Sequence, residues 1–217
     1  MIQMDKKFQK EWFNDQGDKW LKHVSNPFYE EIIFKLLPKI KGKILEIGAG
    51  RFSRKLSELP NVKLTVGDIS KTMLKNIKVK AEKVVLDIED IPFPDNSFDY
   101  VVTFGILHHI SNIKKAIQEC VRVARKGIFF LIEMNPLYTP YTLKMLLNRE
   151  SVEYGILKLP TWKYKKILNE LNLEYKITLT DLGNHRMSKK LFLFCRKIEN
   201  LFKPFLSHIN IYIEMKR

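Results

Sequence analysis

The chain has 217 residues, of which 45% are hydrophobic and 29% charged, and this composition excludes a wholly disordered or fibrous protein. Lysine and arginine number 38 against 24 aspartate and glutamate, and the resulting net charge of +14 favours acidic partners such as nucleic acid, anionic lipid or phosphorylated substrates. Two cysteines exclude a disulfide framework or a cysteine-based zinc site, and no apolar run reaches the roughly 18 residues of a membrane-spanning helix.

The first 40 residues are expected to form two helices, over 4–24 and 27–38. Asn26 and Pro27 suit the cap and the first turn of the second helix. The N-terminal stretch is polar and aromatic and lacks the apolar centre of a secretory signal peptide. We therefore expect a cytoplasmic protein.

Strands and helices then alternate along the chain. A helix is expected through residue 59, another from Ser70 to about 80, and a third over 111–125, ended by Gly127. The expected strands, which lie between and around these helices, are 43–47, 62–66, 83–86, 98–104 and 128–132. Their apolar residues form continuous runs, which is typical of a parallel sheet covered by helices on both faces. The pattern predicts a doubly wound α/β sheet.

After residue 133 the pattern changes. Helices are expected over 140–149 and 160–171, and two strands with alternating polarity over 174–180 and 208–216. The two strands would pair antiparallel at one edge of the sheet. Between them, residues 187–206 carry apolar side chains at helical spacing, surrounded by lysine and arginine.

Ligands of doubly wound sheets bind at the carboxyl ends of the strands. Gly48 and Gly50, after the first strand, allow a tight turn close to a ligand, with helix N–H groups just beyond. Asp68, after the second strand, suits the two hydroxyls of a ribose, although a lone aspartate there is more often a helix cap. Asp87 follows the third strand, and the fourth opens into a loop with two histidines.

The order of these segments resembles a known family. The segments are, in chain order, LEIGAG, VGDIS, VLDIEDIPFPDNSFDYVV, FGILHHI and AIQECVRVARKG before FFLIE. They resemble the ordered motifs of the class I S-adenosylmethionine (SAM)-dependent methyltransferases, in the branch of small standalone, type 11-like enzymes. The resemblance implies a Rossmann-like methyltransferase fold: a seven-stranded, mostly parallel sheet with an antiparallel last strand. It also implies a single domain over 1–217, with lid helices at 1–40, a cofactor-binding core at 43–134, and a lid segment, terminal strands and inserted helix at 135–217.

The resemblance also implies a cofactor, SAM, with S-adenosylhomocysteine (SAH) as product and no metal. The residues that would bind the cofactor are Glu46, Gly48, Gly50, Asp68, Ile69, Asp87, Ile88, Phe104 and Gly105. One position departs from the family, because Phe52 stands where a third glycine is usual.

For the chemistry, His108 and His109 lie where a methyl acceptor should approach, and Glu133 lies at the end of the adjoining strand. A histidine suits general-base work, and Glu133 could orient a histidine or the substrate. The alternative is that the histidines only begin a helix or form a pocket wall. We expect a small-molecule acceptor of glycan, lipid-linked or natural-product type, methylated on a hydroxyl oxygen in preference to nitrogen or carbon.

Two other functions remain open from the sequence, an RNA methyltransferase that uses the positive charge for phosphate contacts and a non-catalytic SAM-binding scaffold. The helix expected over 187–206 has three interpretations. It packs on the sheet edge, lies on an anionic membrane surface, or forms a dimer surface.

Overall fold

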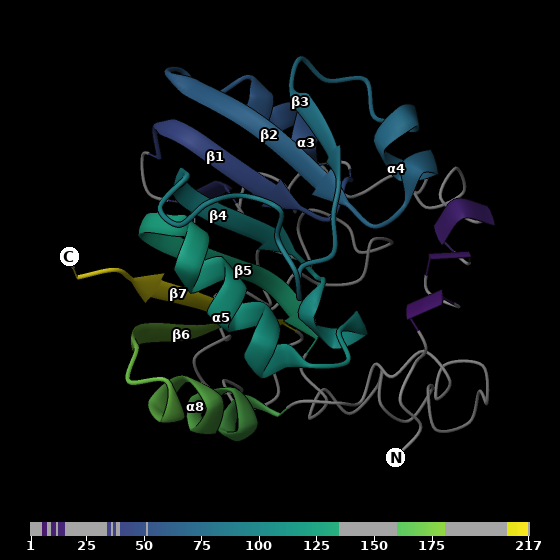
Figure 1. Cartoon of the computed structure of the whole chain (residues 1–217). Helices are drawn as coiled ribbons and strands as arrows, with labels where there is room; N and C mark the ends of the chain where they lie inside the picture. The colour runs from purple at the N-terminus through teal and green to yellow at the C-terminus, as the bar shows by residue number, and fades with distance from the viewer. Residues whose placement is uncertain are drawn as a thin grey trace, which may run out of the picture.

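The computed structural model describes residues 6, 7, 10, 11, 13–15, 34, 35, 37, 40–50, 52–134, 160–180 and 208–216. Its centre is one seven-stranded sheet (Figure 1). The strands are β1 (Gly42–Ile47), β2 (Val62–Asp68), β3 (Glu82–Val85), β4 (Phe98–Phe104), β5 (Ala124–Met134), β6 (Glu174–Thr180) and β7 (His208–Glu214).

The strand order is β3-β2-β1-β4-β5-β7-β6. The first five strands in sequence pair in parallel, whereas β7 pairs antiparallel with both β5 and β6. The chain reverses direction across the sheet beside β1, so the carboxyl ends of β1 and β4 meet at the position where this class of fold binds ligands. The predicted doubly wound sheet with an antiparallel last strand is confirmed.

The helices are α3 (Phe52–Ser57), α4 (Lys71–Asn76), the short 3₁₀ helix η1 (Leu107–His109), α5 (Ile113–Val123) and α8 (Thr161–Glu170). The Ser70 hydroxyl caps α4 by accepting from the Met73 N–H at 3.2 Å, and Asn112 caps α5 through the Lys115 N–H at 3.0 Å. The described residues between 6 and 15, and residues 34 and 35, are helical, as predicted for the N-terminal segment.

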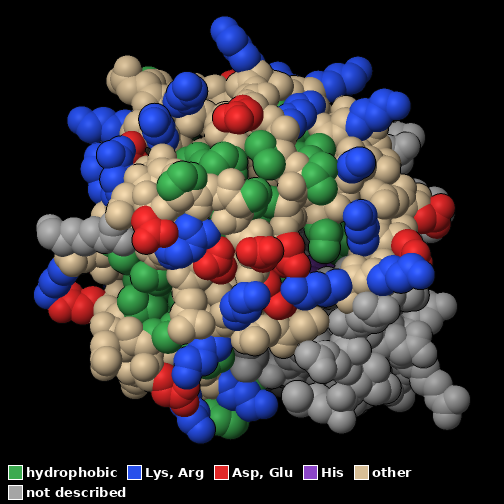
Figure 2. All heavy atoms as spheres, viewed as in Figure 1, with side chains coloured by type: hydrophobic (Ala, Val, Ile, Leu, Met, Phe, Trp, Pro, Cys, Tyr) green, Lys and Arg blue, Asp and Glu red, His purple; other side chains and the backbone are tan. Residues whose placement is uncertain are grey.

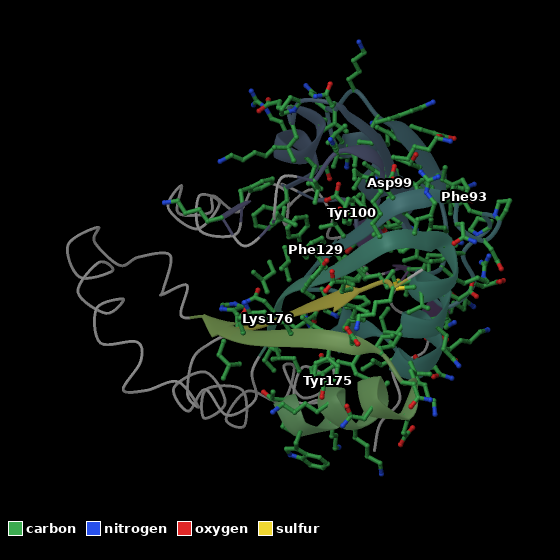
Figure 3. All side chains as sticks on the ribbon, turned by 90° about the vertical axis from the view of Figure 1, so that its left-hand side faces the viewer. Phe93, Asp99, Tyr100, Phe129, Tyr175 and Lys176 are labelled. Carbon is green, nitrogen blue, oxygen red and sulfur yellow. The ribbon has the colours of Figure 1, made fainter. Side chains whose placement is uncertain are left out.

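Two apolar clusters fill the two faces of the sheet. One packs α5 and α8 against side chains such as Val101, Ile128 and Phe130, and the other packs α3 and α4 against the opposite face, including Val102 and Phe129. Figure 3 shows the two faces, with Phe93 on the first and with Tyr100 and Phe129 on the second. Side chains buried on both faces explain why the parallel strands are continuously apolar in sequence.

Several predicted helix ends differ from the structure. Helix α3 stops at Ser57 rather than at residue 59, and α8 stops at Glu170 rather than at residue 171. Helix α4 stops at Asn76 rather than near residue 80, and α5 stops at Val123 because Ala124 already pairs with Phe98 of β4. Gly127 therefore does not end the helix but lies inside β5. A Cβ atom there would lie 2.9 Å from a ring carbon of Tyr212, so the glycine leaves room for that ring to cross the strand.

The remaining predicted helices, over 27–38, 140–149 and 187–206, lie largely or wholly outside the described residues. None of the helices in the described part of the chain combines the length and the apolar composition of a membrane-spanning segment.

Candidate cofactor and acceptor site

The carboxyl end of β1 leads into the turn that carries the predicted glycines. Gly48 has φ +94°, in the left-handed region that favours glycine, and its N–H donates to the Gly67 carbonyl at 2.8 Å. The Gly50 N–H donates to the Ser53 hydroxyl at 3.1 Å. A Cβ atom on Gly48 would lie 3.0 Å from Cδ1 of Ile106, so this turn also lies directly beside the loop after β4.

Asp68 links this turn to the turn after β2 through two hydrogen bonds. One carboxylate oxygen accepts from the Ala49 N–H and the other from the Ser70 N–H, both at 2.7 Å. Burial raises the pKa of Asp68 to about 6, although these two N–H donors favour the charged form. From the sequence, Asp68 is predicted to be a ribose ligand or a helix cap. In the structure it also links two loops through its hydrogen bonds.

Glu46 has the most unusual environment in the site. Its side chain is fully buried, and neither carboxylate oxygen has a hydrogen-bond partner among the described residues. Burial, opposed by the nearby Ser53 hydroxyl and assisted by the Asp68 charge, raises the pKa of Glu46 to about 8, and the Ser53 hydroxyl does not reach hydrogen-bond geometry with it.

A buried carboxyl group without partners is costly unless a ligand supplies donors or positive charge. SAM carries both an ammonium and a sulfonium group. The open glycine turn, Asp68 and the unpartnered oxygens of Glu46 therefore fit this cofactor.

Phe52, the departure from the family motif, begins α3. Its ring is 4% exposed and stacks on Phe104 with 4.5 Å between ring centroids, and Phe34 lies 6.4 Å from each. The side chain thus belongs to the apolar cluster under α3 and does not force the preceding turn to close. Phe104, predicted to close the pocket, contributes to the same aromatic group, and Gly105 after it has φ +64°.

Asp87 is partly engaged by the N-terminal segment. Lys6 Nζ lies 2.7 Å from Asp87 and 2.8 Å from Glu89, and the Glu89 N–H donates to Asp87 at 2.9 Å. The predicted cofactor residue Ile88 lies between them with its side chain in the core, whereas Ile69 is half-buried after β2. No local pattern in the sequence marks Lys6 or Glu89, because their contact joins segments far apart in the chain.

The loop after β4 forms η1, and Glu133 of β5 holds it in place. Oε1 of Glu133 accepts from the Ile106 N–H at 2.9 Å and from the Leu107 N–H at 3.0 Å. Oε2 lies 3.0 Å from Nδ1 of His108. Glu133 is fully buried and His108 is 9% exposed. The structure therefore brings His108 and Glu133 together.

His109 has different neighbours. Its ring lies 4.1 Å from that of His108, and Phe13 of the N-terminal segment packs edge-on against it at 5.5 Å. Tyr164 of α8 is buried, and its pKa lies well above the usual range, first because of burial and then because of the Glu133 charge. The sequence did not single out Phe13 or Tyr164 as neighbours of this pair.

Comparison with known proteins agrees with this geometry. Residues 45–132 match the family model described as a methyltransferase domain. The chain is 31% identical over 131 residues to the ubiquinone/menaquinone biosynthesis C-methyltransferase of Rickettsia akari, covering 52% of each chain. It thus spans about half the length of this curated relative.

Solved structures extend the similarity to nearly the whole fold. A SAM-dependent methyltransferase from Thermotoga maritima, a possible histamine N-methyltransferase, has TM-score 0.69 and 18% identity, covering 95% of this chain and 98% of its own. Magnesium protoporphyrin IX methyltransferase from Synechocystis, with bound SAH, has TM-score 0.64 and 14% identity, covering 97% of this chain and 100% of its own. Residues 45–132 therefore match a methyltransferase domain, and the fold of the chain is that of solved SAM-dependent methyltransferases.

Proposed function

We propose that this protein transfers the methyl group of SAM to a small-molecule acceptor, with a hydroxyl oxygen as the first candidate atom. The observation that carries the proposal is the His108–Glu133 pair, with 3.0 Å between Nδ1 and Oε2, at the carboxyl end of the sheet beside Gly105. The proposed base thus belongs to the loop after β4, which the Gly48 turn approaches through Ile106.

The cofactor supplies a methyl group on a sulfonium, whose departure needs no acid. Glu46, Gly48, Gly50 and Asp68 would hold it. The two carboxyl groups provide negative charge for a cationic ligand, and the glycine turn allows the backbone to approach closely. Asp87 and the Ile88 N–H would contact the adenine, and Ile69 would pack against it. Phe104 and Gly105 would border the methyl end.

His108 would act as the general base. Oε1 of Glu133 accepts from the Ile106 and Leu107 N–H groups and Oε2 from the His108 N–H, which indicates a carboxylate that also accepts the proton on His108 Nδ1. In this tautomer Nε2 carries the free lone pair. Nε2 would take the acceptor's proton while the acceptor oxygen forms its bond to carbon, and the carbon–sulfur electron pair would remain on sulfur. Glu133 would then stabilise the imidazolium.

A second candidate, methylation of carbon, is favoured by the Rickettsia akari relative, which is named a C-methyltransferase. The same base serves both reactions when the acceptor is a phenol or an enol. Removal of the hydroxyl proton spreads negative charge over oxygen and the adjacent conjugated carbon, and the orientation of the acceptor decides which atom meets the methyl group.

A membrane surface remains a proposal for the helix expected over 187–206, which lies outside the described residues. The RNA methyltransferase and the non-catalytic scaffold also remain alternatives. The scaffold predicts cofactor binding without transfer to any acceptor.

The test has two stages. Calorimetric titration with SAM and SAH, for the wild type and Asp68→Ala, should show binding that the variant weakens, and a folded wild type that binds neither would refute the proposal. SAM labelled with ¹³C in the methyl group is then incubated with a phenol, a hydroquinone, an imidazole and a sugar. The ¹³C shift of the product distinguishes methyl on oxygen, nitrogen and carbon. His108→Gln should abolish transfer, and comparison with His109→Gln identifies which histidine is the base.

A further inference from the structure

The side chains of β5 alternate regularly only as far as Leu131. Ile128 and Phe130 pack in the cluster with α5 and α8, whereas Phe129 and Leu131 pack on the opposite face. Ile132 breaks the pattern, because it packs on the same face as Leu131. The next residue, Glu133, is thereby turned to the face of α8.

Without this break, Glu133 would point to the same face as Leu131, since successive strand residues alternate. Its observed contacts are on the other side. Glu133 accepts from the N–H groups of Ile106 and Leu107, whose side chains pack in the cluster with α5 and α8. Its charge also contributes, after burial, to the raised pKa of Tyr164 in α8. The irregularity in β5 therefore decides whether Glu133 can reach His108.

The register with β7 shows that the irregularity is a bulge. Phe130 pairs with Ile211 and Glu133 with Ile209, so three steps along β5 match two along β7 and one residue is extra. Ile132 has φ +55°, a left-handed conformation that is costly for a β-branched side chain. Such a conformation persists only where neighbouring groups hold it.

The holding group is the side chain of Asn210, which lies on β7 between the two paired residues. Its Oδ1 accepts from the Ile132 N–H at 2.9 Å, and the side chain is 3% exposed. The amide thus gives a partner to a backbone donor that the bulge has removed from the regular ladder. A buried N–H without a partner would otherwise destabilise the folded state.

We propose that Asn210 is a positioning residue, which through the bulge at Ile132 turns Glu133 toward His108. This proposal rests on the proposed function for its effect on methyl transfer. Its effect on the histidine ring does not depend on any acceptor. Asn210 would act only through Glu133 and would not touch substrate.

The test compares Asn210→Leu with Ile211→Val in the full chain. Ile211 is buried in the same strand, so its variant loosens the core without touching the Ile132 N–H. The readouts are the ¹⁵N shifts of the His108 ring, which report its tautomer, the affinity for SAH, and the rate with whichever acceptor of the panel the wild type methylates. Asn210→Leu should shift His108 from the Nδ1–H tautomer to a mixture and lower kcat about 100-fold. SAH affinity should stay within about twofold, since the glycine turn is intact.

A rescue variant separates positioning from general damage. Glycine adopts positive φ freely, so Ile132→Gly added to Asn210→Leu should keep the bulge and restore the Nδ1–H tautomer. If Asn210→Leu does not fold, Asn210→Ala takes its place in the same comparison. An unchanged His108 tautomer in the folded variant would overturn the proposal, as would an equal change in Ile211→Val. If the wild type methylates nothing, the proposed function fails while the tautomer still decides the role of Asn210.

Discussion

At the scale of single residues, the site depends on side chains whose environment is unfavourable without a ligand. Glu46 is fully buried and lacks hydrogen-bond partners in the described structure, and Asp68 is buried beside it. Apolar residues at these positions would avoid the cost of burying charge. The unpartnered carboxyl group of Glu46 is therefore better explained by the proposed cofactor binding than by stability, whereas Asp68 also links two loops.

Gly48 provides a residue-scale prediction. An alanine there would adopt φ +94° and place its Cβ 3.0 Å from Ile106 Cδ1. We expect Gly48→Ala to lower the free energy of unfolding by about 1–3 kcal/mol, measured by urea denaturation. It should also weaken SAH binding, because the turn is displaced.

Gly50→Ala is the matched control. A Cβ atom on Gly50 would be no closer than 3.9 Å to the nearest atom, the Gly48 carbonyl oxygen, and the residue has no positive φ. Its free energy of unfolding should stay within about 0.5 kcal/mol of the wild type. Equal losses in the two variants would show that the left-handed turn is not the cause.

At the scale of elements, the predictable features are those encoded locally. Strand β4 has the predicted ends, 98 and 104, because its apolar run is bounded by turn residues, and Ser70 caps α4 because a serine hydroxyl there reaches the first turn. The end of α5 was missed because sheet pairing of Ala124 overrides a helical pattern that continues in the sequence.

The residues of the site divide in the same way, into those that the local sequence marks and those that depend on contacts far apart in the chain. Asp68, His108 and Glu133 could be placed from their positions at strand ends. The bulge at Ile132 could not, because it depends on Asn210, 78 residues further along the chain. The partners Lys6 and Phe13 were missed for the same reason, since long-range contacts leave no periodicity in the sequence.

The N-terminal segment provides an element-scale prediction. Its described residues lie along the carboxyl end of the sheet, where Asn14 accepts from the Ser70 hydroxyl at 2.6 Å and Lys6 binds Asp87 and Glu89. Partial burial lowers the pKa of Lys6, but the hydrogen bonds to the two carboxylates outweigh it and raise that pKa. Lys6→Met should therefore lower the melting temperature slightly at low salt, by the equivalent of less than about 1 kcal/mol, and speed SAH dissociation in stopped-flow measurements.

Lys10→Met is the control in the same segment, because Lys10 is exposed. Lys10→Met should leave both the melting temperature and the rate of SAH dissociation unchanged. For Lys6→Met, the difference from the wild type should disappear at high salt, since ions screen the pair. A difference that persists at high salt would indicate lost packing of the lysine stem instead of a lost ion pair.

At the scale of the whole molecule, the net charge of +14 does not by itself select a partner. Figure 2 shows lysine and arginine dispersed over one face, with acidic side chains among them across its centre. Some of the basic residues are paired, as in the contacts of Arg125 and Lys126 with Asp99. A nucleic-acid site needs positive charge gathered along a continuous path, and this face offers none, so it gives no support to the RNA alternative.

Protonation couples the stability of the whole protein to cofactor binding. The pKa of Glu46 is raised from 4.5 to about 8, so between these values the folded protein holds a proton that the unfolded chain has lost. The stability contributed by this proton is fully present below pH 4.5 and is lost as the pH rises to about 8. A cationic ligand favours the ionised form, and its binding should release the proton.

We therefore expect the affinity for SAM to rise between pH 6 and 8 by up to about tenfold per unit and to level off above, because Glu46 becomes ionised in the free protein. SAH lacks the sulfonium charge, so the ratio of SAM to SAH affinity should rise over the same range. The pKa of Asp68, about 6, lies at the lower edge of this window, which leaves Glu46 as the main group titrating within it. Calorimetry in two buffers of different ionisation enthalpy measures the released proton, and Glu46→Gln should abolish both the release and the pH dependence of the ratio. If the ratio of SAM to SAH affinity varies with pH equally in Glu46→Gln and the wild type, another group causes the effect and Glu46 does not belong to the cofactor site.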